Sequence, residues 1–525
     1  MVPGGEARVG TKGGFFFSLY LLAQPAAVTV GAAATTAQLH PGETSKAASD
    51  KTGREETKPR PTFARSGAVT GISKPVSGQR PSSLVRLPTY QNVRFEEDWS
   101  VLSASRQREG WQALKYLPLS PGGNVYMSVG GQVRFRTEFW NDFGFGGSGQ
   151  RDDTFGLFRL RLHGDFFFGP HLRLFVEGKS ALADGRELPG GNRTLDTDSV
   201  AFQNVFFDVR VPLEGKGSLT FRVGRQELEF GKQRLVSPLD WSNTRPRTFD
   251  GFSGIFKKGS WRVDGFWTRH AKVRKFDFNP HDTGTDFFGI QAAGRLASWT
   301  TEFYWFGLDR ERASYGGLMA PETRQTLGTH LAGKLPAGWD LDFEGAYQFG
   351  NHGQRDIDAF MVATQIGYRF PSLRTAPRVY AGFDYASGDD DPGNGEIHTF
   401  NQLFPLGHAY FGFIDMVGRQ NIVSFTQGVS LKVLPKSSLK ADHHFFWRAN
   451  KNDALYNAGG GIVRSGGAGL SREVGSELDL TFSHKLNAHL VTTFGYSHLF
   501  PGGFIKESGP SRGIDFGYIA VQYTF

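Results

Sequence analysis

The sequence predicts an all-β protein, a transmembrane antiparallel β-barrel preceded by a disordered N-terminal tail. The 525 residues include 69 Gly and 48 Phe but no run of apolar residues long enough for a transmembrane helix, which needs about 20. Much of the chain instead alternates apolar and polar residues, as a strand does when one face meets lipid and the other a polar interior. Because strands are the only other way across a bilayer, these observations favour a barrel. The absence of Cys excludes a disulfide framework and thiolate metal sites.

The C-terminal segment, residues 517–525, shows the alternation clearly. Ile519, Val521, Tyr523 and the terminal Phe525 share one face, with small or polar residues between them. Aromatic residues at the end of such a strand suit the membrane interface. A half-buried edge strand of a soluble sheet protein is the alternative for this segment alone. If the barrel is right, we expect the barrel-assembly machinery to recognise Phe525.

The N-terminus has the pattern of an export signal. Arg8 and Lys12 precede the apolar run Phe15–Ala23, and small residues follow up to Ala37. We therefore predict a signal peptide over 1–37, since the apolar run is too short for a retained anchor. Residues 38–88 are rich in Ser, Thr, Pro, Gly and Lys, and we expect a disordered periplasmic linker because so few large apolar side chains cannot offset chain entropy.

The remaining chain divides into a short entry segment and the barrel. In residues 89–123 the apolar side chains are spaced as in short helical turns, with Trp99, Leu102 and Trp111 as examples. We predict that this periplasmic segment packs at the barrel mouth. Residues 124–525 alternate in pattern and are broken by turn clusters rich in Gly, Asp and Pro. At about 20 to 25 residues for each strand and its connection, this length accommodates roughly 16 to 20 strands.

Charged residues gather on one face of the predicted strands. In the segment QVRFRTEFW, Arg134, Arg136 and Glu138 oppose Phe135 and Phe139. The segment FRLRLHGD repeats the pattern, with two arginines, a histidine and an aspartate opposite Phe and Leu. A cation facing the bilayer midplane costs about 2 to 4 kcal/mol, so we expect these side chains to face the interior.

Two interior arrangements remain open. The arginines and carboxylates could neutralise one another and fill a closed, structural barrel. Alternatively, the cations could outnumber the acids at a constriction and favour anions, since low-dielectric walls focus the field of fixed charges. In the first two charged strands, the four arginines Arg134, Arg136, Arg159 and Arg161 exceed the two acids Glu138 and Asp165. We therefore favour an anion-selective conduit.

Several stretches resemble the alginate export family of outer-membrane proteins. The entry segment contains Glu97-Asp98-Trp99 and the sequence KYLPL, and the first strand contains RFRTE. The clearest similarity is VGRQELEFGKQRLVSPLDWSNTRPRTFDGF over 223–252, followed by TFNQLFP, VGSELDL and FGYSHLFPGGF. The resemblance covers nearly everything after the linker, and the motifs are specific as a set.

This resemblance implies a monomeric barrel of about eighteen strands in the outer membrane, whose arginine-rich lumen passes an anionic polysaccharide such as alginate or a related anionic saccharide. The positions that match the family's basic motifs, and that we expect to line the substrate path, are Arg134, Arg136, Arg159, Arg161, Arg225, Arg234 and Arg247. The matched acidic partners are Glu138, Glu227 and Asp250. A structural interpretation competes: Arg225, Glu227, Arg234 and Asp250 could form an ion-pair network that holds a constriction loop.

Other functions are less favoured. The acidic stretch 389–394 offers the oxygen ligands that Ca²⁺ prefers but lacks EF-hand spacing, so we expect a solvated loop. We expect no enzyme, cofactor or metal, because the sequence has no nucleophile elbow, P-loop or HExxH helix. Its basic residues alternate with Phe and Leu in strands, which argues against nucleic-acid binding. The alternatives kept are a general or small-anion porin, a structural barrel with an ion-paired interior and, more remotely, a lipid hydrolase.

Overall fold

A computed structural model describes residues 87–104, 110–391 and 393–525. The predicted signal peptide and all of the predicted linker except residues 87 and 88 lie outside these ranges. Among the described residues, no helix is both long enough and apolar enough to cross a bilayer.

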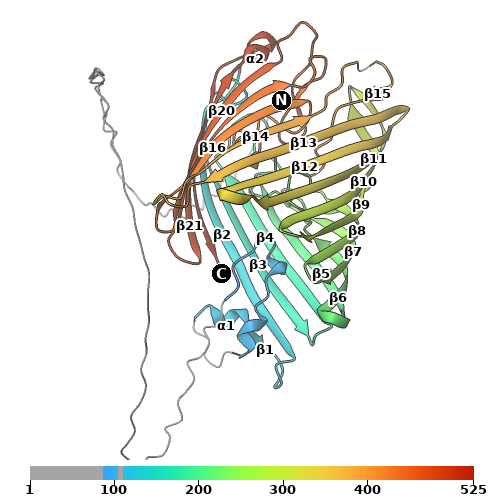
Figure 1. Cartoon of the computed structure of the whole chain (residues 1–525), viewed down its shortest axis with the longest axis vertical. Helices are drawn as coiled ribbons and strands as arrows, with labels where there is room; N and C mark the ends of the chain where they lie inside the picture. The colour runs from blue at the N-terminus through green and yellow to red at the C-terminus, as the bar shows by residue number, and fades with distance from the viewer. Residues whose placement is uncertain (1–86, 105–109, 392) are drawn as a thin grey trace, which may run out of the picture. The chain divides into compact units, whose positions relative to one another are not determined.

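Eighteen antiparallel strands form a closed barrel, as the sequence predicts (Figure 1). The wall strands are β2 (Val125–Asn141), β3 (Asp153–Phe168), β4 (Leu172–Asp184), β5 (Asp198–Leu213), β6 (Gly217–Gln226), β7 (Phe249–Lys258), β8 (Trp261–Ala271), β9 (His281–Leu296), β10 (Trp299–Tyr315), β11 (Leu318–Lys334), β12 (Trp339–His352), β13 (Arg355–Arg369), β14 (Arg378–Ala386), β16 (Ile422–Leu434), β17 (Ser437–Arg448), β20 (Glu473–Lys485), β21 (Leu490–Pro501) and β22 (Ile514–Thr524). The short strands β1 (Leu117–Pro118) and β15 (Glu396–Ile397) add to the margins of β2 and β13, and β18 (Leu455–Tyr456) pairs with β19 (Ile462–Arg464) in a separate hairpin.

The barrel closes where the last strand pairs with the first. β22 runs antiparallel to β2 from the pair Gln132↔Thr524 to the pair Asn141↔Asp515. This closure leaves neither strand with an unpaired edge. The alternation recognised in the C-terminal segment therefore belongs to a wall strand of the barrel.

The two ends of the barrel differ in their connections. At one end, here called the turn end, neighbouring strands are joined by short turns such as 169–171 and 259–260. The opposite end, the loop end, carries the long connections, among them 227–248, 387–421 and 449–472. A short helix, α2 (Gly503–Ser508), lies at the loop end, at the top of Figure 1.

The outward face of the wall is apolar. Phe135, Phe252 and Trp267 are 58%, 65% and 59% exposed, and each alternates with a buried residue that points inward. Such a surface is unfavourable in water and suits lipid.

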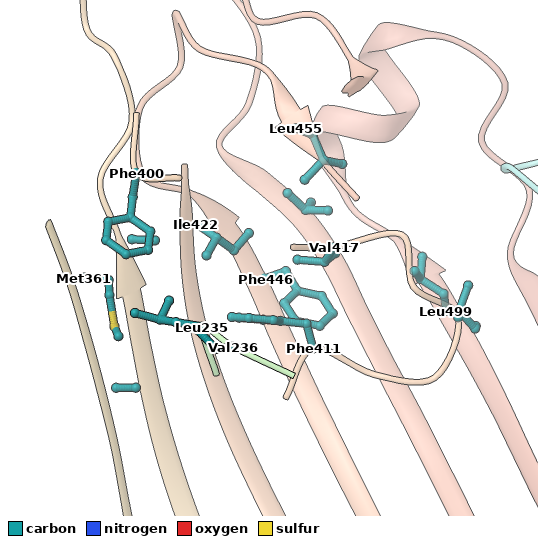
Figure 2. Packing of buried hydrophobic residues seen from close by; sticks show 14 of the residues in the cluster. Leu235, Val236, Met361, Phe400, Phe411, Val417, Ile422, Phe446, Leu455 and Leu499 are labelled. Carbon is teal, nitrogen blue, oxygen red and sulfur yellow. The ribbon is translucent and has the colours of Figure 1, made fainter. Parts of the chain in front are cut away.

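Apolar side chains also fill the interior of the loop end, which the sequence did not predict. Leu235, Val236, Phe400, Phe411 and Val417 come from the long loops and form one buried cluster with strand residues. Figure 2 shows Ile422, Phe446 and Leu499 of the wall turned toward these loop residues. The long loops thus fold into the barrel and form a hydrophobic core in its loop-end half.

The entry segment lies at the turn end, at the foot of Figure 1. It contains the 3-10 helices η1 (Arg94–Glu96) and η2 (Ser100–Ala104), the single helical turn α1 (Gln112–Lys115) and strand β1, which pairs with β2. Three further 3-10 turns, η3 (Glu214–Lys216), η4 (Pro336–Gly338) and η5 (Gly407–Ala409), lie in connections between strands.

Candidate functional site

Three arginines of the wall converge on one stretch of loop 227–248 inside the barrel. Arg134 donates to the backbone carbonyls of Asp240, Trp241 and Ser242 at 2.8, 3.3 and 3.0 Å. Arg136 donates to the Trp241 carbonyl at 2.7 Å and stacks over the Trp241 ring at 4.0 Å. Arg159 donates to the Asp240 carboxylate at 2.8 Å and to the carbonyls of Asp240 and Ser242. We call these three guanidinium groups the arginine cradle.

The cradle follows from strand geometry. Arg134 and Arg136 are two residues apart on β2, so both point inward, and the register pairs Arg134 with Arg159 on β3. Adjacent strands lie about 4.8 Å apart, which brings the three guanidinium groups within reach of one short segment. Glu138, two residues further along β2, forms an ion pair with Arg136 at 2.7 Å and accepts a hydrogen bond from Trp140.

A largely buried ion network adjoins the cradle. Arg245 of the same loop pairs with Glu227 and, at 2.6 Å, with Asp240. Arg161 pairs with Glu177 at 3.0 Å and lies 3.7 Å from Glu227. The side chains of Arg161, Glu177, Glu227 and Arg245 are at most 1% exposed. Removing one partner would leave a buried charge uncompensated, so this network fixes the loop firmly in the barrel.

The arginines also control the ionisation of the loop. Burial would raise the pKa of Asp240, but Arg159, Arg245 and Arg134 hold the pKa of this carboxyl well below its usual range. Asp240 therefore remains an anion among cations. An oxyanion is thus the kind of group that this part of the barrel stabilises.

Arg234 and Arg247 of the loop reach other partners. Arg234 pairs with Asp342 at 2.8 Å and Glu344 at 3.1 Å, both on β12. Arg247 donates to the carbonyl of Pro405 in loop 387–421, and burial lowers its pKa to about 9. Neither arginine joins the cradle, but each ties loop 227–248 to another part of the interior.

The expectation that Arg225 and Asp250 line the lumen is wrong. Arg225 shares the outward parity of Val223, and Asp250 shares that of Phe252, while the neighbouring Gln226 and Phe249 are buried inside. The two residues face each other across β6 and β7 in a bidentate ion pair of 2.7 and 2.8 Å. They lie at the loop-end margin of the outer wall, where a partly exposed pair can be solvated.

Sequence reasoning missed Asp240, the loop partner of the cradle, and Arg245, which pairs with Asp240. It also left Lys179 out of the candidate set, although Lys179 pairs with Asp198 at 2.9 Å and donates to the carbonyl of Thr244 at 2.5 Å. Lys179 continues the inward alternation of β4 and could have been included on that ground. Asp240 and Arg245 lie in a loop without periodicity, so no sequence pattern indicated where they point.

In the part of the chain that the structure describes, no group of three or more His, Asp or Glu side chains is arranged to hold a metal ion. In the acidic stretch 389–394, the Asp389 carboxylate accepts hydrogen bonds from the backbone of Asp391 and from Tyr315.

A comparison with protein families identifies the chain. The model of the family described as "Alginate export" matches residues 125–518, which is nearly the whole barrel. The chain belongs to the alginate export family. The resemblance stated from the motifs is thereby confirmed, and the residues outside the match are the N-terminal 124 and the last seven.

Solved structures share the fold of this alginate export family barrel. Pseudomonas aeruginosa OccK2 (OpdF) aligns with a TM-score of 0.50 at 14% identity, over 76% of this chain and 97% of that one. Pseudomonas aeruginosa OpdK, solved with vanillate, aligns with a TM-score of 0.50 at 12% identity, over 76% of this chain and 98% of that one. No curated protein sequence matches the chain. Family and fold together place the protein in the outer membrane as a β-barrel of the channel-forming type.

Proposed function

We propose that this outer-membrane barrel passes an anionic polysaccharide or oligosaccharide, alginate-like in charge, and that the described conformation is its closed state. The arginine cradle carries the proposal. Terminal NH groups of its three arginines donate to carbonyl and carboxylate oxygens of the chain's own loop, while the three buried Nε atoms have no hydrogen-bond partner within the described part of the chain. The carboxylates of an acidic saccharide present the same acceptor chemistry, so cargo can replace the loop without leaving these NH groups unsatisfied.

The balance of charge supports passage of anions. Among the described residues, Arg134 and Arg247 have carbonyl acceptors but no carboxylate within ion-pair distance. When loop 227–248 moves away, Arg134 faces the lumen as an unpaired cation that stays charged at any physiological pH. Several weak contacts along a path allow cargo to enter and also to leave.

Direction follows from the barrel ends. In bacterial outer-membrane barrels the short turns face the periplasm and the long loops face outward. We assign the turn end to the periplasm on that rule. An exported saccharide would then enter past the entry segment and leave through the long loops.

A closed structural barrel is the second candidate, and one observation favours it. The hydrophobic cluster in the loop-end half resembles a protein core and must be displaced before any saccharide passes. A general or small-anion porin differs from the main proposal in cargo size alone and needs the same displacement.

The test is ion selectivity in planar bilayers across a salt gradient. We expect an anion-selective reversal potential for the full-length protein, reduced toward zero in the double variant Arg134→Gln/Arg136→Gln. Arg225→Gln is the control: it removes one positive charge from the outward face, where the double variant removes two from the interior, and it should leave the potential unchanged. A cation-selective potential, or equal shifts in both variants, would contradict the proposal.

A loop-releasing variant separates the two candidates. Glu227→Gln removes the carboxylate that pairs with Arg245 and lies beside Arg161. If neither the native protein nor this variant conducts after insertion, the structural barrel is the correct description.

A further inference from the structure

The entry segment enters the turn end of the barrel. We call residues 91–99 the strap. Its Phe95 is buried between Phe175 on β4 and Phe206 on β5, with ring centroids 5.7 and 5.0 Å away in edge-to-face geometry. Arg222 on β6 lies 4.4 Å from the centre of the Phe95 ring. The strap is thus anchored inside the mouth by an aromatic side chain packed against the wall.

Backbone contacts fix the strap to the wall on both sides of this anchor. Arg173 on β4 donates to the carbonyl of Phe95 at 2.7 Å. Arg94 donates to the carbonyl of Gly131 at 3.0 Å and to that of Phe525 at 2.9 Å, next to the seam where the barrel closes. Glu97 pairs with Arg94 at 2.6 Å and accepts a hydrogen bond from Trp99.

Acidic residues of the strap face basic residues of the wall. Glu96 pairs with Arg262 at 2.9 Å and with Lys257 at 3.5 Å. Arg173, Arg222 and Arg262 each have an aspartate partner on the wall, whereas Glu96 is the one ion-pair partner of Lys257 among the described residues. Partial burial opposes ionisation, but Arg262 and Lys257 lower the pKa of Glu96 to about 2.

The strap lies between two cavities. The outer one, about 720 Å³, is lined by strap residues and by Arg173, Arg210, Arg222 and Lys257. The inner one, about 200 Å³, is lined by Glu96, Arg222 and Arg262 together with residues of loop 227–248. A carboxylate that reached the barrel from the turn end would meet these cations first.

The tip of the strap contacts the loop that fills the cradle. The side chain of Asn92 accepts a hydrogen bond from Arg245 at 2.8 Å and donates to Glu229. The backbone carbonyl of Asn92 accepts a second hydrogen bond from Arg245 at 3.0 Å. Displacing the strap therefore removes two acceptors from Arg245, which also holds loop 227–248 in place.

We propose that the cations at the turn end form an entry site for the carboxylates of an acidic saccharide, that Glu96 of the strap occupies this site in the closed state, and that arriving cargo displaces it. The cargo class rests on the proposed function; the displacement of Glu96 does not. Competition at Lys257 and Arg262 frees the strap, and loss of the Asn92 contacts then weakens the hold on loop 227–248. Entry of cargo and opening are thereby coupled through one segment.

Glu96→Gln tests this coupling in the full-length chain. The variant keeps the shape of the side chain but removes the charge that competes with cargo. We expect the open fraction in planar bilayers to rise about two- to fivefold, the range for loss of a partly exposed ion pair. Asp98→Asn is the matched control, because it removes the same charge two residues away, where the described contact is a hydrogen bond from the backbone of Ser100.

The entry site is tested with an oligouronate as probe and an uncharged oligosaccharide of equal length as control. In the Glu96→Gln background, the oligouronate should bind more tightly from the turn side. Adding Lys257→Gln should weaken oligouronate binding about two- to fivefold and so reverse that gain. Equal open fractions in Glu96→Gln and Asp98→Asn, or oligouronate affinity indifferent to Lys257, would overturn the inference.

The readouts separate this inference from the proposed function. If Glu96→Gln raises the open fraction but the current is cation-selective, the strap closes the barrel and the proposed cargo is wrong. If the current is anion-selective and Glu96→Gln behaves like Asp98→Asn, the proposed function holds and the strap is a structural brace.

Discussion

Loop 227–248 and the strap both enter the barrel, but they are held in different ways. The loop is fixed by ion pairs between side chains that are at most 1% exposed, such as Arg245 with Glu227. The strap is held at Glu96 by pairs whose members remain 32% to 51% exposed, and elsewhere by buried side chains, Phe95 and Arg94 among them. Partly exposed pairs contribute up to about 1 kcal/mol, whereas breaking one fully buried pair costs about 3 to 5 kcal/mol.

This difference implies that the strap is released from the barrel before loop 227–248. Solvent and cargo can reach Glu96 and its partners, so this contact yields first, and the strap touches Arg245 through Asn92. Loop 227–248 cannot exchange its partners until a substitute oxyanion is near the cradle. Under the proposed function, such a channel would stay shut to small solutes and open to a ligand that carries several carboxylates.

The largest loss of stability is expected from a substitution in the buried ion pairs of loop 227–248. Glu227→Gln leaves Arg245 without its buried carboxylate and should destabilise the folded barrel by about 3 to 5 kcal/mol. Thermal unfolding in detergent micelles measures this loss. Glu96→Gln is the comparison variant. A destabilisation of equal size in this variant would show that the strap and loop 227–248 are held equally firmly.

The strap's anchor is the next strongest contact. Phe95→Ala should weaken docking of the strap by about 3 kcal/mol, because a large buried ring is lost, while the melting temperature of the barrel stays nearly unchanged. Hydrogen exchange at the backbone amides of Glu96 and Glu97, which bond within the strap, measures the docking. Leu119→Ala, at a 55% exposed position of the same entry segment, should leave these amides protected. Slow exchange in Phe95→Ala would contradict the anchoring role.

Docking of α1 should depend on pH through Lys115. Burial, reinforced by the nearby charge of Arg94, lowers the pKa of Lys115 from 10.5 to about 7. Between these values the undocked lysine binds more protons than the docked one, so docking becomes stronger as pH rises from about 7 to 10.5, by up to about 1.4 kcal/mol per pH unit. The Lys115 amine is closely surrounded. It lies 5.2 Å from the centre of the Trp99 ring, and a Cβ atom added to Gly130 would come within 2.3 Å of the amine.

Protection factors at the amide of Leu114, which bonds to the carbonyl of Trp111, report this docking. Lys115→Met should make them independent of pH over the same window. If the protection factors of the native protein do not change with pH, Lys115 does not change its protonation on docking.

The smallest effect is expected outside the barrel. Asp250→Asn breaks the outward pair with Arg225, where the side chains are 27% and 14% exposed. We expect a loss of about 1 kcal/mol or less in thermal unfolding and an unchanged reversal potential. A selectivity shift as large as that of Arg134→Gln/Arg136→Gln would return this pair to the conduction path.

The sequence predicts the wall better than what fills it. Alternation placed Arg134, Arg136, Arg159 and Arg161 on the inward face because a strand has only two faces and lipid admits no charge there. The same rule, applied to Phe221, Val223 and Arg225, puts Arg225 outward. The similarity of the GRQ motif to the family implies the opposite, and the structure follows parity.

The interior loops escaped prediction for a physical reason. Leu235, Phe400 and Val417 lie in segments without a repeat, and their burial depends on contacts between parts of the chain far apart in sequence. The bridge between Val236 and Phe404 joins two such loops. The strap was expected at the mouth, but the pairing of Glu96 with Lys257 and Arg262 depends on barrel closure, which local sequence does not encode.

The most direct test of the arginine cradle is block of single-channel current by an oligouronate. We predict brief blocks whose frequency rises with oligouronate concentration, none with a neutral oligosaccharide of equal length, and about tenfold fewer in Arg134→Gln/Arg136→Gln at the same concentration, as for loss of charge-assisted hydrogen bonds. Equal block by the acidic and neutral sugars, or a block frequency that is unchanged by loss of both arginines, would contradict the account.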